Sequence, residues 1–165
     1  MEAKTATRKR AGTENAVTIK RVINLPVSKV WRAFTDETEF KKWWGPNGYT
    51  CPSSSLEPRV GGKYFKCMRS PDGKDNWSVG TVKKFVPEKT LVITDSFADE
   101  NGNIINANDI GMPGNWPDQS LITIQLEEAN GATKFKLIHE GIPEEAHDDC
   151  VQGWNESLDK LEKNI

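Results

Sequence analysis

His139 and Asp95 are the polar residues of this sequence whose placement could support chemistry. In the segment TKFKLIH, Thr133, Leu137 and His139 alternate with two lysines, so the imidazole shares the apolar face of a strand. Asp95 has the same parity as Ile93 in the segment TLVITDSF. An inward carboxylate needs a partner, and a polar contact inside a wet cavity would provide one. Such residues can also exchange protons with a ligand. The simplest alternative for His139 is a core histidine held by one hydrogen bond.

Three residues near the C-terminus could provide zinc ligands, since His147 and Cys150 share a helical face and His139 precedes them in a strand. Cys150, however, falls near the apolar stripe of the expected helix, and no second cysteine is nearby. The sequence also lacks a GxSxG motif, and neither histidine adjoins a candidate nucleophile. We therefore expect no metal, no cofactor and no catalytic residue.

The elements that position these residues follow from hydrophobic periodicity and turn signals. Residues 16–24 alternate as a half-buried strand, and Pro26 then begins a short amphipathic helix. A second short helix is expected over residues 37–44. Strand-like runs separated by turn residues follow, and Asn130-Gly131 between two alternating runs is the strongest hairpin signal in the chain. The pattern predicts a meander of antiparallel strands.

The C-terminal segment is typical of one long amphipathic helix. Its apolar residues recur at steps of three and four: Ala146, Cys150, Val151, Trp154, Leu158 and Leu161. Such a stripe must cover an apolar surface, and the sheet is the only candidate. Gly153 is expected to let the helix approach the sheet closely. The sequence therefore predicts an α+β helix-grip fold, in which a curved antiparallel sheet of six or seven strands wraps around the C-terminal helix, with two short helices after the first strand.

The adjacent Trp43 and Trp44 close the second short helix, just before Gly45 and Pro46. In a helix-grip fold the two short helices plug one open end of the curved sheet, so we expect Trp43 to pack into the core. Trp44 lies about 100° further round the helix and cannot point in the same direction. We place it at the mouth of a cavity or on a partly exposed patch.

Composition and charge describe one globular domain. The chain has 165 residues and a net charge of −2, which favours neither nucleic acid nor an anionic membrane surface. A disordered basic tail is expected at 1–14, and a single domain at 15–165. No apolar run could span a bilayer and no secretory signal is evident, so we expect a cytoplasmic protein. The three cysteines argue against a disulfide framework.

Several motifs, in this order, resemble those of a known superfamily. They are VW at Val30-Trp31, WWGP at Trp43 to Pro46, VGG at Val60 to Gly62, FADENGN at Phe97 to Asn103, Trp116-Pro117, and GW with two leucines at Gly153, Trp154, Leu158 and Leu161. From about Val17 to Leu161 the chain is similar to the SRPBCC superfamily of START-like and Bet v 1-like domains. Within it, the chain resembles homologues of the activator of the ninety-kilodalton heat-shock protein's ATPase. The resemblance implies the helix-grip fold and leaves the activity undefined.

We expect a non-enzymatic, START-like domain that binds a small apolar or lipid-like ligand in an internal cavity between the sheet and the C-terminal helix. The resemblance also implies a role in stress. The expected lining is Phe65, Trp77, Asp95, Phe97, His139 and Trp154, with Trp44 and Trp116 at the cavity mouth. The superfamily also implies an alternative, a polyketide cyclase or hydrolase in which Asp95 and His139 act as acid and base. A chaperone-interacting, co-chaperone-like module is implied by the family alone. A homodimer also stays open.

Overall fold

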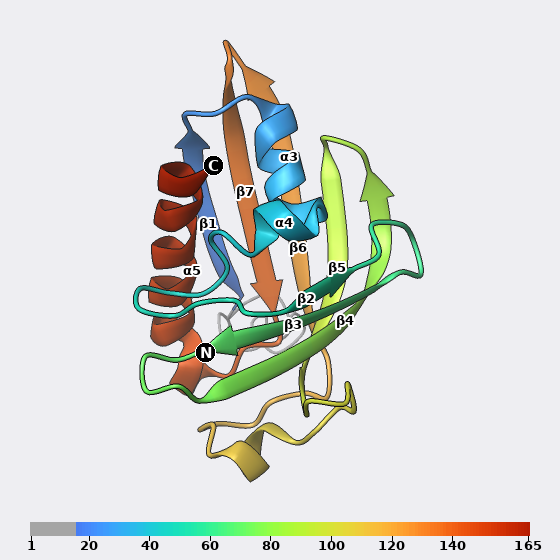
Figure 1. Cartoon of the computed structure of the whole chain (residues 1–165), viewed down its shortest axis with the longest axis vertical. Coiled ribbons are helices and arrows are strands. Elements are labelled where there is room, and N and C mark those ends of the chain that lie inside the picture. The colour runs from blue at the N-terminus through green and yellow to red at the C-terminus, as the bar shows by residue number, and fades with distance from the viewer. Residues whose placement is uncertain (1–15) are drawn as a thin grey trace, which may run out of the picture.

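A curved antiparallel sheet and the long helix α5 dominate the computed structural model, which describes residues 16–165 (Figure 1). The elements in chain order are β1 (Val17–Ile23), α3 (Val27–Thr35), α4 (Glu37–Phe40), β2 (Ser54–Leu56), β3 (Lys63–Arg69), β4 (Asp75–Val86), β5 (Thr90–Ala98), the 3-10 helix η1 (Ala107–Ile110), β6 (Ser120–Ala129), β7 (Ala132–Glu140) and α5 (Glu144–Asn164). The basic tail expected at 1–14 lies outside the described residues.

The sheet has seven strands in the order β1-β7-β6-β5-β4-β3-β2, and each strand is antiparallel to its neighbour. Strands β6 and β7 form the hairpin that the sequence predicted, with Ala129 opposite Ala132. Asn130 and Gly131 have φ of 53° and 85°, as a tight two-residue hairpin turn requires. The predicted helix-grip fold is therefore confirmed, including its two short helices and its long C-terminal helix.

The helices cover the face of the sheet to which Phe135 and His139 of β7 both belong, because residues four apart in a strand point the same way. Phe34 of α3 stacks on Phe135 with ring centroids 5.8 Å apart. Trp154 of α5 meets His139 edge to face, with ring centroids 6.1 Å apart. The core therefore lies between this face and the three helices.

The tandem tryptophans lie in the turn after α4 rather than on its last helical turn. The helix ends at Phe40, although the backbone N–H groups of Trp43 and Trp44 still donate to the Phe40 carbonyl. Gly45 then takes a φ of 107°, which turns the chain away. Trp43 is 0% exposed, and its indole Nε1 donates to the Ala33 carbonyl at 2.8 Å. Its predicted place in the core is confirmed.

The C-terminal half of helix α5 makes polar contacts with two distant segments. Lys160 Nζ donates to the carbonyls of Gly45 at 2.8 Å and Tyr49 at 2.9 Å, which ties the loop after the tandem tryptophans to the helix. On the other side, Arg21 of β1 forms ion pairs with Asp159 and with Glu162. These contacts hold α5 against both the edge strand and the loop.

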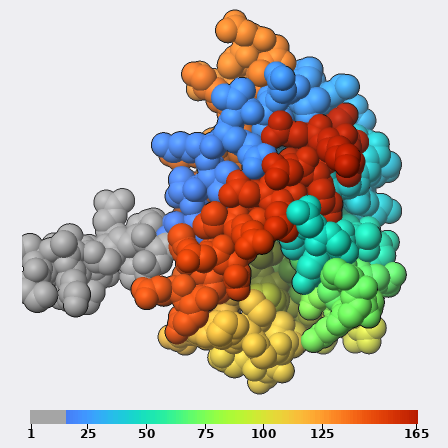
Figure 2. Space-filling model, turned by 90° about the vertical axis from the view of Figure 1, so that its left-hand side faces the viewer, coloured from blue at the N-terminus to red at the C-terminus, as the bar shows by residue number. Residues whose placement is uncertain are grey.

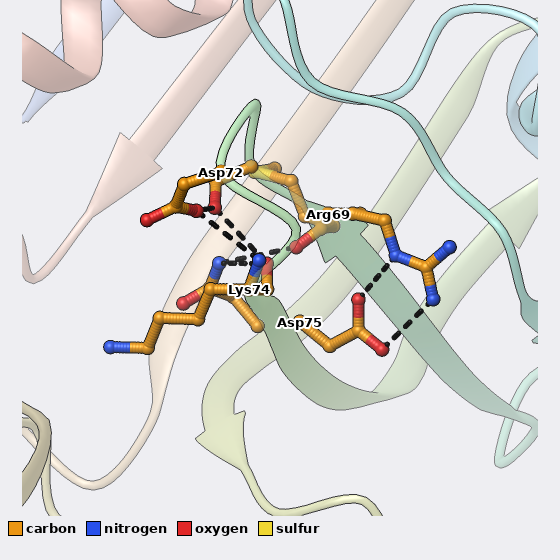
Figure 3. Close-up of polar contacts among 7 residues, drawn as sticks. Arg69, Asp72, Lys74 and Asp75 are labelled. Carbon is orange, nitrogen blue, oxygen red and sulfur yellow. Dashed lines mark hydrogen bonds and ion pairs between the residues drawn. The ribbon is translucent and has the colours of Figure 1, made fainter.

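The turn between β3 and β4 is closed by a bidentate ion pair (Figure 3). Arg69 Nε lies 2.7 Å from Asp75 Oδ1, and its Nη2 lies 3.2 Å from Asp75 Oδ2. This guanidinium lowers the pKa of the Asp75 carboxyl. At the tip, the Asp72 carboxylate accepts from the Lys74 backbone N–H. The long β3–β4 hairpin therefore ends in a well-defined turn.

Candidate functional site

A pocket of about 310 Å³ lies between α5 and the sheet. Figure 2, in which α5 faces the viewer, shows a hollow below this helix, between the yellow segment that joins β5 to β6 and the green β3–β4 turn. The lining residues come from the loop after α4, from strands β3, β5, β6 and β7, from the segment that joins β5 to β6, and from α5. They are Trp44, Pro46, Met68, Asp95, Ser96, Phe97, Met112, Pro113, Trp116, Pro117, Ser120, His139, Ala146, Asp149, Cys150, Gly153, Trp154 and Ser157. The volume falls within the usual range for small-molecule sites, about 300–1,000 Å³.

His139 is the centre of a hydrogen-bonded chain at the buried end of this pocket. Its imidazole is 6% exposed. The indole Nε1 of Trp154 donates to His139 Nδ1 at 3.1 Å, and the Cys150 sulfur lies 3.7 Å from the same nitrogen. Nε2 lies 2.9 Å from the Ser120 hydroxyl, which donates to the Asp95 backbone carbonyl at 3.1 Å.

This chain of contacts fixes the tautomer of His139. An indole N–H can only donate, so Nδ1 must accept with its lone pair and the proton must sit on Nε2. Burial lowers the pKa of His139 to about 4, because desolvation disfavours the imidazolium and outweighs the opposing effect of Asp95. The imidazole is therefore neutral at pH 7, and both of its nitrogens are already occupied.

Cys150 also lines the pocket, where burial favours its neutral thiol over the thiolate. Burial and the negative charge of Asp95 raise its pKa to about 12. A reactive cysteine requires a lowered pKa, so that a thiolate is present at neutral pH. The side chain therefore contributes a neutral thiol to the wall of the pocket.

A buried ion pair lies beside the pocket. Lys66 on β3 has a side chain that is 2% exposed, and its Nζ lies 3.2 Å from Asp95 Oδ1. The same ammonium lies 5.1 Å from the centroid of the Trp44 ring, within the range of a cation–π contact. Lys66 pairs with Ser78 of β4, and Ser78 pairs with Phe97 of β5, so only a small side chain separates the lysine from β5. Asp95 thus has the partner that its inward position demands.

Aromatic rings form much of the pocket wall. Trp44 stacks on Phe40 at 4.8 Å and meets Trp154 edge to face at 5.5 Å. Across the pocket, Phe97 and Trp116 form an edge-to-face pair at 5.0 Å. Each of these rings therefore packs against an aromatic neighbour.

Six of the eight side chains that the sequence assigned to a cavity line this one pocket. They are Asp95, Phe97, His139 and Trp154 from the expected lining and Trp44 and Trp116 from the expected mouth. Phe65 and Trp77 lie outside the pocket, where they stack on each other with centroids 4.9 Å apart. Phe65 follows the inward Tyr64 in β3, and successive residues of a strand point to opposite faces.

Two features of the site differ from the sequence-based interpretation or were missed by it. Lys66 was not singled out, although it has the same parity as Tyr64 and Met68, which is the signal that could have found it. Gly153 does not serve close packing against the sheet, because a Cβ built there meets no atom within 4 Å. Its missing side chain instead leaves space in the pocket that it lines.

The three residues considered as zinc ligands do not form one cluster. His147 contacts Asp148 at 3.2 Å, whereas His139 and Cys150 belong to the network described above. Within residues 16–165, no group of three or more His, Cys, Asp or Glu side chains is arranged to hold a metal. In the same part of the chain, no helix is both long enough and apolar enough to cross a membrane.

The curved seven-stranded sheet, its long C-terminal helix and the pocket between them define the START-like, Bet v 1-like class of the SRPBCC superfamily. The sequence profile described as "Activator of Hsp90 ATPase homolog 1-like protein" matches residues 24–165. The chain therefore belongs to that family, as its motifs predicted.

Solved structures support the same assignment of the fold. A protein of Chromobacterium violaceum is 28% identical with a TM-score of 0.75, over 90% of this chain and 95% of that one. The AHSA1 protein of Silicibacter pomeroyi is 21% identical with a TM-score of 0.72, over 90% and 95% of the two chains. A protein of Arthrobacter aurescens is 24% identical with a TM-score of 0.74, over 89% and 83%. A comparison with curated proteins gave no significant match.

Proposed function

We propose that this chain is a non-enzymatic binding domain that holds a small, largely apolar ligand in the pocket between α5 and the sheet. The observation that carries this proposal is the pocket itself, with about 310 Å³ of space enclosed by paired aromatic rings. Sites of this kind are concave and mostly apolar, with a few polar groups that fix orientation. The family and its fold are consistent with ligand binding.

The state of the polar side chains supports binding over catalysis. A general base needs a free lone pair near the reacting proton, whereas His139 Nδ1 already accepts from Trp154. The Asp95 carboxylate is paired with Lys66, and the Cys150 thiol has a raised pKa. If the protein were a cyclase or hydrolase, the wild type would turn over members of a panel of aromatic polyketide and ester substrates. The His139→Gln variant would then lose that turnover. We expect no turnover by either protein.

Native mass spectrometry of freshly purified protein tests the binding proposal. We expect adducts of a small molecule on the wild-type chain, either co-purified or acquired from a panel of aromatic and lipid compounds. Gly153→Leu is the matched control, because its side chain would extend into the pocket while remaining compatible with a helix. Unliganded wild-type protein after exposure to the whole panel would contradict the proposal, as would equal uptake by the Gly153→Leu variant.

The family description favours one second candidate, a contact with the Hsp90 chaperone. A co-chaperone of this kind would raise the ATPase rate of Hsp90 and would be retained by its middle domain in a pull-down. Under the binding proposal, we expect an unchanged ATPase rate and no retention. A stimulated rate that survives in the Gly153→Leu variant would favour the chaperone role and separate it from pocket binding.

A further inference from the structure

Most hydrogen-bond donors in the pocket wall are already used by the protein itself. The hydroxyl and indole groups that donate internally are Ser96 to the Asp118 carbonyl, Trp116 to the Pro113 carbonyl, Ser120 to the Asp95 carbonyl, Trp154 to His139, and Ser157 to the Gly153 carbonyl. The indole of Trp44 is the exception within the described residues, since it makes no such bond. The wall thus has few donors to offer a ligand.

Acceptors, in contrast, remain available. Asp95 uses Oδ1 for Lys66, and within residues 16–165 its Oδ2 accepts no hydrogen bond. The Asp95 side chain is 23% exposed and lines the pocket. Its negative charge affects the pKa values of His139 and Cys150, which are both pocket residues. Asp149 adds a second, exposed carboxylate at the rim.

The charges of the site disfavour an anionic ligand. The only buried cation beside the pocket, among the residues that the structure describes, is Lys66, and it is already paired with Asp95 and covered by the Trp44 ring. A ligand carboxylate would therefore meet the Asp95 and Asp149 carboxylates without a free positive partner, and like charges at close range are unfavourable. A neutral donor, in contrast, would form a charge-assisted hydrogen bond with Asp95.

From this surplus of acceptors we propose that the pocket selects a neutral aromatic ligand that carries a hydroxyl group, with Asp95 Oδ2 as the acceptor of the hydroxyl proton. The proposal rests on the proposed function and adds the chemical class of the ligand. The aromatic part follows from the walls, since Trp44, Phe97 and Trp116 offer ring faces and edges to a planar molecule. The hydroxyl part follows from Asp95.

Isothermal titration of the full chain with three naphthalene probes at pH 7 tests this selectivity. 2-Naphthol is a neutral donor, 2-methoxynaphthalene has the same rings without a donor, and 2-naphthoate is an anion of similar size. We expect 2-naphthol to bind about tenfold more tightly than either of the other two, as a hydrogen bond to a charged group implies. The comparison needs no variant, so it does not depend on how well a substituted protein folds.

Variants then assign the preference to one carboxylate. Asp95→Asn alone would leave the Lys66 ammonium buried without its partner, so the double variant Lys66→Gln/Asp95→Asn is measured beside it. In both, we expect the preference for 2-naphthol over its methyl ether to fall to about threefold or less, because the acceptor is no longer charged. Asp148→Asn, which removes a carboxylate from an exposed side chain outside the pocket, is the matched control and should retain the tenfold preference.

The possible outcomes distinguish a wrong ligand class from a wrong binding function. Equal affinity for 2-naphthol and its ether, or tightest binding of 2-naphthoate, would overturn the ligand class while the binding function stands. A preference lost in Asp148→Asn and kept in the Asp95 variants would also overturn it. Absence of binding by all three probes would contradict the ligand class and the proposed function together.

Discussion

Both ring nitrogens of His139 are used in hydrogen bonds within the protein. Its neutral form accepts from Trp154 at one nitrogen and faces the Ser120 hydroxyl at the other. A proton added to Nδ1 would point at the indole N–H of Trp154, so the geometry of the network disfavours the charged form, as burial does. The stability of the fold should depend on pH for this reason.

The pH dependence has a definite sign. The pKa of His139 is about 4 in the folded protein, compared with an ordinary value of 6.5. Between these values the unfolded chain binds a proton that the folded protein does not, so this contribution is fully present above pH 6.5 and is lost as the pH falls toward 4. The difference corresponds to about 3 kcal/mol in the free energy of unfolding.

Urea unfolding of the wild type and of His139→Gln from pH 7 to pH 4 measures this contribution. We expect the stability difference between the two proteins to shrink by about 3 kcal/mol over that range, because other groups cancel in the difference. His147→Gln, at the outer end of α5, is the control and should keep the wild-type dependence. A wild-type advantage over His139→Gln that stays constant with pH would disprove the assignment.

Trp154 and Trp44 contact each other but should differ in their contribution to stability. Trp154 is 8% exposed and donates to His139, whereas Trp44 is half-buried at the pocket wall. We expect Trp154→Ala to lower the free energy of unfolding by about 3–5 kcal/mol, and Trp44→Ala by distinctly less. Denaturant melts of both variants give the order, and a less stable Trp44 variant would refute it.

Among the elements, helix α5 has two roles: its buried side chains pack in the core, and Gly153 lines the pocket. Gly153 lies inside the helix, where glycine costs about 1 kcal/mol relative to alanine, and no packing contact in the structure requires it. Its position on the pocket wall is the remaining reason for its presence. Glycine at this position therefore lowers the stability of the helix and leaves space in the pocket.

Gly153→Ala should separate these two roles. We expect the variant to be more stable by about 1 kcal/mol in urea melts and to bind 2-naphthol more weakly, because the added methyl group takes up pocket space. Gln152→Ala, on the exposed side of the same helix, is the control and should bind as the wild type does. Loss of stability in Gly153→Ala would mean that the site has no room for a methyl group.

Strand β3 shows why part of the site could not be predicted from the sequence. The antiparallel meander, the closing helix and the inward positions of Asp95 and His139 follow from periodicity, which long regular elements express clearly. In β3, an interpretation by hydrophobicity places Phe65 inside and Lys66 outside, whereas the structure has the opposite. The parity that Lys66 shares with Tyr64 is a local signal, but its partner Asp95 comes from β5, and no local pattern encodes that long-range pairing.

At the scale of the whole molecule, the sheet and α5 enclose a pocket whose polar end is rigid and whose walls are aromatic. The loop after the tandem tryptophans is tied to α5 by Lys160, so Trp44 and Trp154 are held together at one side of the pocket. Trp116 closes the other side with Phe97. Three of the six tryptophans of the chain thus line one site.

These tryptophans allow the most direct test of whether the pocket under α5 is the ligand site. In a titration of ¹⁵N-labelled protein with 2-naphthol, the indole N–H signals of Trp44, Trp116 and Trp154 should show the largest changes in chemical shift. Trp31 and Trp77, outside the pocket, should keep theirs. Changes that are largest at Trp31 or Trp77, or that are absent from all the indole signals at saturating 2-naphthol, would contradict this assignment.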